Sequence, residues 1–95
     1  MSSDELTGLV ARRLEEVYRA GTTTIEIKSG YGLTIESEVS QTAVANAVTT
    51  ESTFLGAHVV PAEFEGRTDD YVDLVCTSML DAVASNVRWI DVFCE

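Results

Sequence analysis

The sequence is poor in the residues that several classes of protein require. One histidine and two cysteines in 95 residues are too few for a disulfide framework or a zinc site built of those residues. Six lysines and arginines stand against sixteen acids, and a net charge of -10 argues against nucleic-acid or membrane binding, which needs a basic patch. No apolar run approaches ~18 residues and no signal-peptide pattern opens the chain. We therefore expect a cytoplasmic protein that does not span a membrane.

What the chain does contain is typical of one small globular unit. It is 45% hydrophobic and 23% charged, and it shows neither internal repeats nor low-complexity linkers. We therefore treat residues 1–95 as a single segment of one domain.

Hydrophobic periodicity predicts the order helix, strand, helix, strand, helix, strand. A capping box of Ser2 and Glu5 begins the first helix, which should end near residue 19 or 20, before Gly21. Thr34 and Thr68 are the expected caps of the second and third helices. The second helix has a narrow apolar stripe, made of Ile35, Val39, Ala43 and Ala47. The strands are expected at residues 22–27, 52–56 and 88–94. Their starts are spaced as in βαβ units, which take about 30 residues or more, so the strands should be parallel.

The alternation along the strands favours a curved sheet with helices on one face. Glu26 and Lys28 share the polar side of the first strand, and Asp91 lies on the corresponding side of the third. Strands of an open doubly wound sheet, covered on both faces, read instead as nearly unbroken apolar runs. The fold class we predict is α/β, a partial (β/α)₈ barrel of about three βα units. An open three-stranded sheet is the alternative. In either case Glu26, Lys28 and Asp91 must pair with one another or reach water.

Two strand ends carry candidate ligand-binding side chains. The first strand runs into a turn in which Gly30 and Gly32 both permit positive φ and push the ring of Tyr31 outward. The second strand ends at His58, the one histidine of the chain. In α/β proteins ligands bind beyond the carboxyl ends of the strands, where Glu95 adds a carboxylate after the third. A packing tyrosine and a structural histidine are the plainer alternatives.

Four stretches of the chain resemble the imidazolonepropionase family of the metal-dependent amidohydrolase superfamily. They are residues 21–33, 53–61, 71–75 and 89–95, in matching order and spacing. The most specific are the Lys-Ser-Gly-Tyr-Gly-Leu run at residues 28–33 and the Phe-Leu-Gly-Ala-His run at residues 54–58. The resemblance covers essentially the whole chain.

The resemblance implies a (β/α)₈ barrel holding one zinc or iron ion, which activates a water molecule. The implied reaction opens the ring of 4-imidazolone-5-propanoate to give N-formimidoyl-L-glutamate in histidine degradation. Tyr31 and His58 match the substrate-binding tyrosine and histidine of the family, and neither is expected to hold the metal. Glu95 matches a position whose role we leave unspecified.

The chain departs from the family in its metal ligands. The family uses a His-x-His pair, a later histidine and a later aspartate, and a chain with one histidine cannot supply that set. The substrate-binding arginine that follows the His-x-His pair is also missing. We expect an interior slice of the barrel that is inactive alone, completed by the missing remainder or by association of several copies. The alternative function is a small stand-alone α/β module for binding or regulation, without catalysis.

Overall fold

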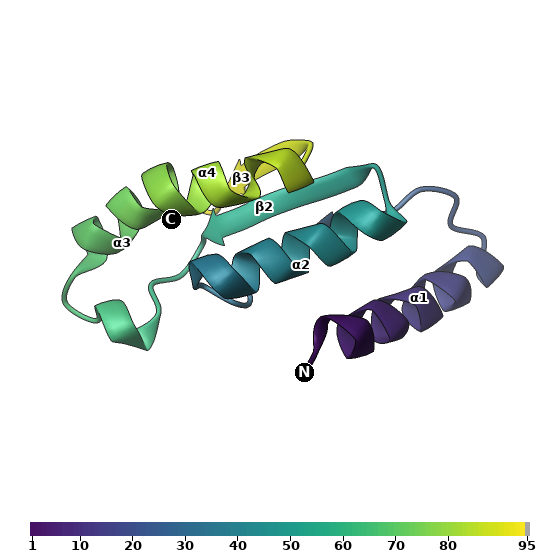
Figure 1. The fold of residues 1–95 in the computed structure, drawn as a ribbon. Helices are drawn as coiled ribbons and strands as arrows, with labels where there is room; N and C mark the ends of the chain where they lie inside the picture. Colours follow the sequence, from purple (N-terminus) through teal and green to yellow (C-terminus); the bar gives the residue numbers. More distant parts are fainter. Residues whose placement is uncertain (95) are drawn as a thin grey trace.

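The computed structural model describes residues 1–94, which form a three-stranded parallel sheet with helices (Figure 1). The strands follow one another across the sheet in the order β1-β2-β3, and both neighbouring pairs are parallel. The elements are α1 (Ser3–Arg19), β1 (Glu26–Lys28), α2 (Ile35–Val48), β2 (Glu51–Ala57), η1 (Ala62–Phe64), α3 (Thr68–Leu74), η2 (Val75–Met79), α4 (Leu80–Val83), η3 (Ala84–Asn86) and β3 (Trp89–Val92). The α/β class and the parallel pairing expected from the sequence are confirmed.

The helices pack on one face of this sheet. In Figure 1, α2 and the run from α3 to α4 lie in front of the sheet, below and above the β2 arrow in this view, and α1 lies beside α2. Phe54 of β2 points into this layer and is fully buried among side chains of the third helical run. These partners are Tyr71, Val75, Met79 and Val83. None of the helices found within residues 1–94 combines the length and apolarity needed to cross a bilayer.

The first helix begins and ends as the sequence predicts. The backbone N–H of Glu5 donates to Ser2 Oγ at 3.2 Å, and the Ser2 N–H donates to Glu5 Oε2 at 2.7 Å, so the capping box is complete. At the other end Gly21 takes a φ of +104° and its N–H donates to the Tyr18 carbonyl. A glycine adopts this left-handed conformation without the steric penalty of a side chain, so the helix stops here.

The outer strands are shorter than the alternation predicts. Residues 22–27 were expected to form the first strand, but only Glu26–Lys28 pairs. Glu26 lies opposite Glu51, the first residue of β2, so residues before Glu26 have no neighbouring strand to bond to. The third strand is likewise Trp89–Val92 rather than residues 88–94. The extent of each strand was set by the partner's length, which the local pattern does not contain.

The predicted apolar stripe of the second helix is confirmed at Ile35 and Val39, which pack against the core, and is wrong in its second half. Ala43 and Ala47 are exposed, and the buried side of α2 includes Glu38 and Thr42. The apolar residues buried on this side are Val44 and Ala45. The two polar residues can be buried because they find hydrogen-bond partners inside the structure. In the third helix, Thr68 is the first helical residue rather than the cap, and no side chain caps α3.

Candidate functional site

The loops that follow β1 and β2 meet at the carboxyl edge of the sheet. His58 Nε2 lies 2.6 Å from the carbonyl oxygen of Gly30, so the loop carrying Tyr31 is held directly against the second strand end. The Tyr31 side chain itself is 90% exposed. The structure thus brings the loops of the two candidates together and leaves the phenol open to solvent. Glu95 lies outside the described residues.

Gly30 occupies a position that only glycine fits. Its φ is +117°, in the left-handed region that other residues rarely adopt. A Cβ atom at this position would lie 2.3 Å from the Leu55 carbonyl oxygen and 3.0 Å from His58 Nε2. The positive φ expected for Gly30 is therefore confirmed, and the missing side chain is also what allows the loop to approach β2.

Gly32 serves a different purpose from the one predicted. It does not have a positive φ, and the left-handed residue at this end of the turn is Leu33, with φ at 59°. A Cβ atom on Gly32 would lie 2.3 Å from the Ser37 Cβ atom. Close packing of the loop on the first turn of α2, rather than backbone dihedral freedom, therefore excludes a side chain here.

Glu38 is the residue of this site that the sequence did not reveal. It is fully buried in α2, and its carboxylate accepts hydrogen bonds from Ser29 Oγ and the Gly30 N–H, both at 3.2 Å. With the Gln41 amide oriented to satisfy both of its groups, Nε2 donates to Glu38 Oε2 at 3.2 Å and Oε1 accepts from the Gly32 N–H at 3.0 Å. The Glu38 carboxylate thus holds the loop that bears Tyr31, both directly and through Gln41.

The only signal for this role in the sequence was weak. Sequence reasoning placed Glu38 near the positive end of the helix dipole, a common surface arrangement. Its spacing of four from Thr42 put two polar residues on one helical face, which is the pattern of a buried hydrogen-bonded face as well as of a solvated one. The hydrogen-bond donors that allow Glu38 to be buried lie in the loop before α2.

Tyr71 fixes the end of β2 from the helical side. Its hydroxyl donates to the Gly56 carbonyl oxygen at 2.8 Å, and the ring is almost completely buried. Burial, with a further contribution from the negative charge of Glu38, raises the pKa of Tyr71 to about 12. Tyr71 therefore remains a neutral hydrogen-bond donor at physiological pH.

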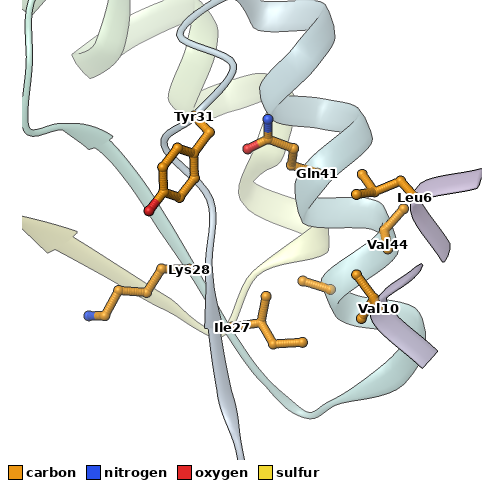
Figure 2. A pocket seen from close by; sticks show the side chains of 8 residues that line it. Leu6, Val10, Ile27, Lys28, Tyr31, Gln41 and Val44 are labelled. Atoms are coloured by element: carbon orange, nitrogen blue, oxygen red, sulfur yellow. The ribbon is translucent and has the colours of Figure 1, made fainter. Parts of the chain in front are cut away.

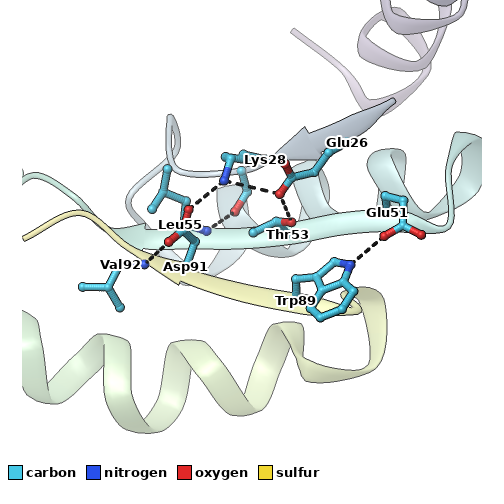
Figure 3. A network of polar contacts seen from close by, with 9 residues as sticks. Glu26, Lys28, Glu51, Thr53, Leu55, Trp89, Asp91 and Val92 are labelled. Atoms are coloured by element: carbon cyan, nitrogen blue, oxygen red, sulfur yellow. Dashed lines mark hydrogen bonds and ion pairs between the residues drawn. The ribbon is translucent and has the colours of Figure 1, made fainter. Parts of the chain in front are cut away.

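The opposite face of the sheet carries a charged cluster (Figure 3). Lys28 Nζ lies 2.7 Å from Asp91 Oδ2 and 3.3 Å from Glu26 Oε1, and Thr53 Oγ1 donates to the same Glu26 oxygen at 2.5 Å. Hydrogen bonding to Asp91 raises the pKa of Lys28, and the same bond lowers the pKa of Asp91. The bond from Thr53 lowers the pKa of Glu26. The expectation that these charges pair or reach water is confirmed on both counts, since all three side chains are also solvent-exposed.

A separate cavity of about 320 Å³ lies between α1, β1 and α2 (Figure 2). Its walls are mainly apolar, with Lys28, Tyr31 and Gln41 as the polar exceptions. The apolar lining consists of Leu6, Val10, Ile27, Val44 and Ala45. Because His58 does not line it, this cavity is not the place where the two strand-end loops meet.

The described residues offer no ligand set for a metal ion. Among residues 1–94, no three side chains of histidine, cysteine, aspartate or glutamate come close enough together to hold one. The charged cluster provides two carboxylates, but Lys28 Nζ lies between them and supplies the positive charge. The residues present therefore do not fit a metal site by themselves.

A sequential parallel sheet with helices on one face, and loops converging at its carboxyl edge, defines an α/β protein built of βα units.

No family model matches the chain. Curated proteins named imidazolonepropionase do match it: that of Salinispora tropica is 57% identical over 94 residues, 99% of this chain and 24% of the relative. That of Mycolicibacterium smegmatis is 57% identical over 90 residues, and that of Cutibacterium acnes 58% over 82 residues. These two matches cover 95% and 86% of this chain, and 23% and 20% of the relatives. The chain belongs to the imidazolonepropionase family and spans about a quarter of the length of these relatives.

Proposed function

We propose that the chain is the substrate-binding part of an imidazolonepropionase, which hydrolyses 4-imidazolone-5-propanoate to N-formimidoyl-L-glutamate. The observation that carries this proposal is the 57% identity with a protein of that name over 94 residues. The chain contributes three βα units of a (β/α)₈ barrel. The rest of the barrel corresponds to the three quarters of the relatives' length that the chain does not span. The one-sided helical layer and the sequential strand order support this arrangement.

In this proposal Tyr31 and His58 bind the substrate. The exposed phenol of Tyr31 donates a hydrogen bond to it, and its loop is held by the hydrogen bonds to Glu38. His58 uses Nε2 to hold the Gly30 carbonyl, which leaves Nδ1 for the substrate. When Nδ1 carries a hydrogen, this donor also stabilises the negative charge that develops on the ring oxygen as water adds to the cyclic amide.

The metal ion of the complete enzyme, zinc or iron, has its ligands outside this chain. Residues 1–94 do not bring together a ligand set. In this proposal the chain's own residues bind and orient the substrate. The partner we propose is the remainder of the barrel, in the same polypeptide or in an associated one. The proposed compartment is the cytoplasm, and the two free thiols of the chain suit reducing conditions.

A chimera tests the proposed function. In it, this chain replaces the 94-residue stretch that it matches in the Salinispora tropica protein. We expect kcat/KM for 4-imidazolone-5-propanoate to stay within about tenfold of the parent, a change of at most about 1.4 kcal/mol in the barrier. The 95-residue chain assayed alone should show no turnover. A folded, metal-loaded chimera without activity would contradict the proposal, as would turnover by the isolated chain.

A further inference from the structure

We propose that Glu38 is a positioning residue for His58. The buried carboxylate anchors the peptide units on both sides of the Gly30 carbonyl, and that carbonyl holds the imidazole so that Nδ1 is presented at the carboxyl edge of the sheet. The inference rests on the proposed substrate-binding role of His58, but its structural part can be tested independently of activity.

The contact between His58 and Gly30 fixes the position of one proton. A carbonyl oxygen can only accept a hydrogen bond, so Nε2 at 2.6 Å must carry hydrogen. In the neutral imidazole, Nδ1 is then the unprotonated nitrogen, and in the protonated form it is the second donor. In both states the ring is held through Nε2 and acts on a ligand through Nδ1.

The carbonyl that holds His58 belongs to the peptide unit joining Gly30 to Tyr31. The preceding unit is anchored through the Gly30 N–H to Glu38, and the following unit through the Gly32 N–H to Gln41. Gln41 is itself bonded to Glu38 Oε2. Glycine dihedrals are soft, so a peptide unit that begins at a glycine keeps its orientation only if the units on both sides of it are fixed. Here both anchors depend on one carboxylate.

An ionised carboxylate suits this position better than an amide. It is an acceptor only, and three donors converge on it from Ser29, Gly30 and Gln41. Glutamine at position 38 could keep the two bonds made to Oε2 by turning its amide nitrogen toward Ser29 Oγ, which can also accept. Methionine, similar in size but without a comparable acceptor, cannot keep them. Because the Glu38 side chain is fully buried, water cannot replace a lost bond. The Glu38→Met change thus removes loop anchors while nearly preserving volume.

The chain's single histidine gives a direct readout of this arrangement. In the ¹⁵N-labelled 95-residue chain, we expect an Nε2–H proton resonance that is hydrogen-bonded and protected from solvent exchange. Glu38→Met should lose that protection, and Glu38→Gln, which keeps one acceptor oxygen, should retain part of it. Glu36→Gln changes an exposed residue of the same helix and should leave the resonance unchanged.

The second test measures the kinetics of variants of the chimera. We expect Glu38→Met to lower kcat/KM about tenfold to a hundredfold without loss of metal, as for other residues that orient a functional group. If that variant fails to fold, Gln41→Ala at a half-buried position carries the test, with a smaller loss of protection and activity. Folded variants that keep both the protected resonance and the parental kcat/KM would overturn the proposal. The unsubstituted chimera could instead be inactive while the isolated chain still shows the Glu38-dependent resonance. That result would contradict the proposed function but not the positioning role of Glu38.

Discussion

Replacing His58 by alanine in the chimera should lower kcat/KM by about two to three decades while the metal content stays at the parental level. A group that orients the substrate and stabilises its developing charge contributes roughly 2–4 kcal/mol to lowering the barrier. The structure places His58 against Gly30, and no set of metal-ligating side chains forms anywhere in residues 1–94. Because the role we propose for His58 is to bind the substrate, the expected loss is kinetic and not a loss of metal.

Metal analysis of the purified variant beside its kinetics checks this result. Tyr31→Phe provides the matched comparison, because it removes only the hydroxyl of a side chain that is 90% exposed. We expect a smaller effect from it, mainly in KM. A metal-free His58→Ala protein would show that His58 is a metal ligand and that the role we propose for it is wrong.

Gly30→Ala should be the most destabilising single-methyl change in this loop. The added Cβ atom would lie 2.3 Å from a backbone oxygen that cannot rotate away, and the φ of +117° is itself unfavourable for alanine. Overpacking and backbone strain each cost about 1–3 kcal/mol, so the free energy of unfolding should fall by about 2–6 kcal/mol. Any folded fraction must move the loop away from Leu55 and His58.

Gly21→Ala separates these two contributions. Its φ of +104° is similar, but a Cβ atom there meets nothing within 4 Å. We expect it to cost only the backbone strain, about 1–2 kcal/mol. Urea unfolding of the two variants, followed by circular dichroism, gives the comparison. Equal losses at both positions would contradict the close approach of the Gly30 loop to β2.

The elements that the sequence predicted correctly are those encoded within a few residues. The capping box of Ser2 and Glu5 and the terminating Gly21 define α1 without reference to the rest of the chain. The shared polar face of Glu26, Lys28 and Asp91 followed from a period of two and from parallel pairing, and its ion pairs required nothing further.

The features that the sequence missed depend on contacts between distant elements. Whether Glu38 is buried depends on donors in the loop before α2, and polar periodicity alone does not distinguish that arrangement from a solvated face. The length of β1 depends on where β2 begins. That Leu33 rather than Gly32 has the positive φ depends on how the loop packs against Ser37. The ligand-binding roles of Tyr31 and His58 came from family resemblance and remain proposals.

The most direct test of the account is a crystal structure of the chimera with N-formimidoyl-L-glutamate bound. We expect the Tyr31 hydroxyl and His58 Nδ1 each within about 2.7–3.2 Å of a ligand heteroatom. His58 Nε2 should remain on the Gly30 carbonyl, and the metal ion should be held only by residues from outside this chain. A ligand that contacts neither Tyr31 nor His58, or a metal ion coordinated by His58, would contradict the account.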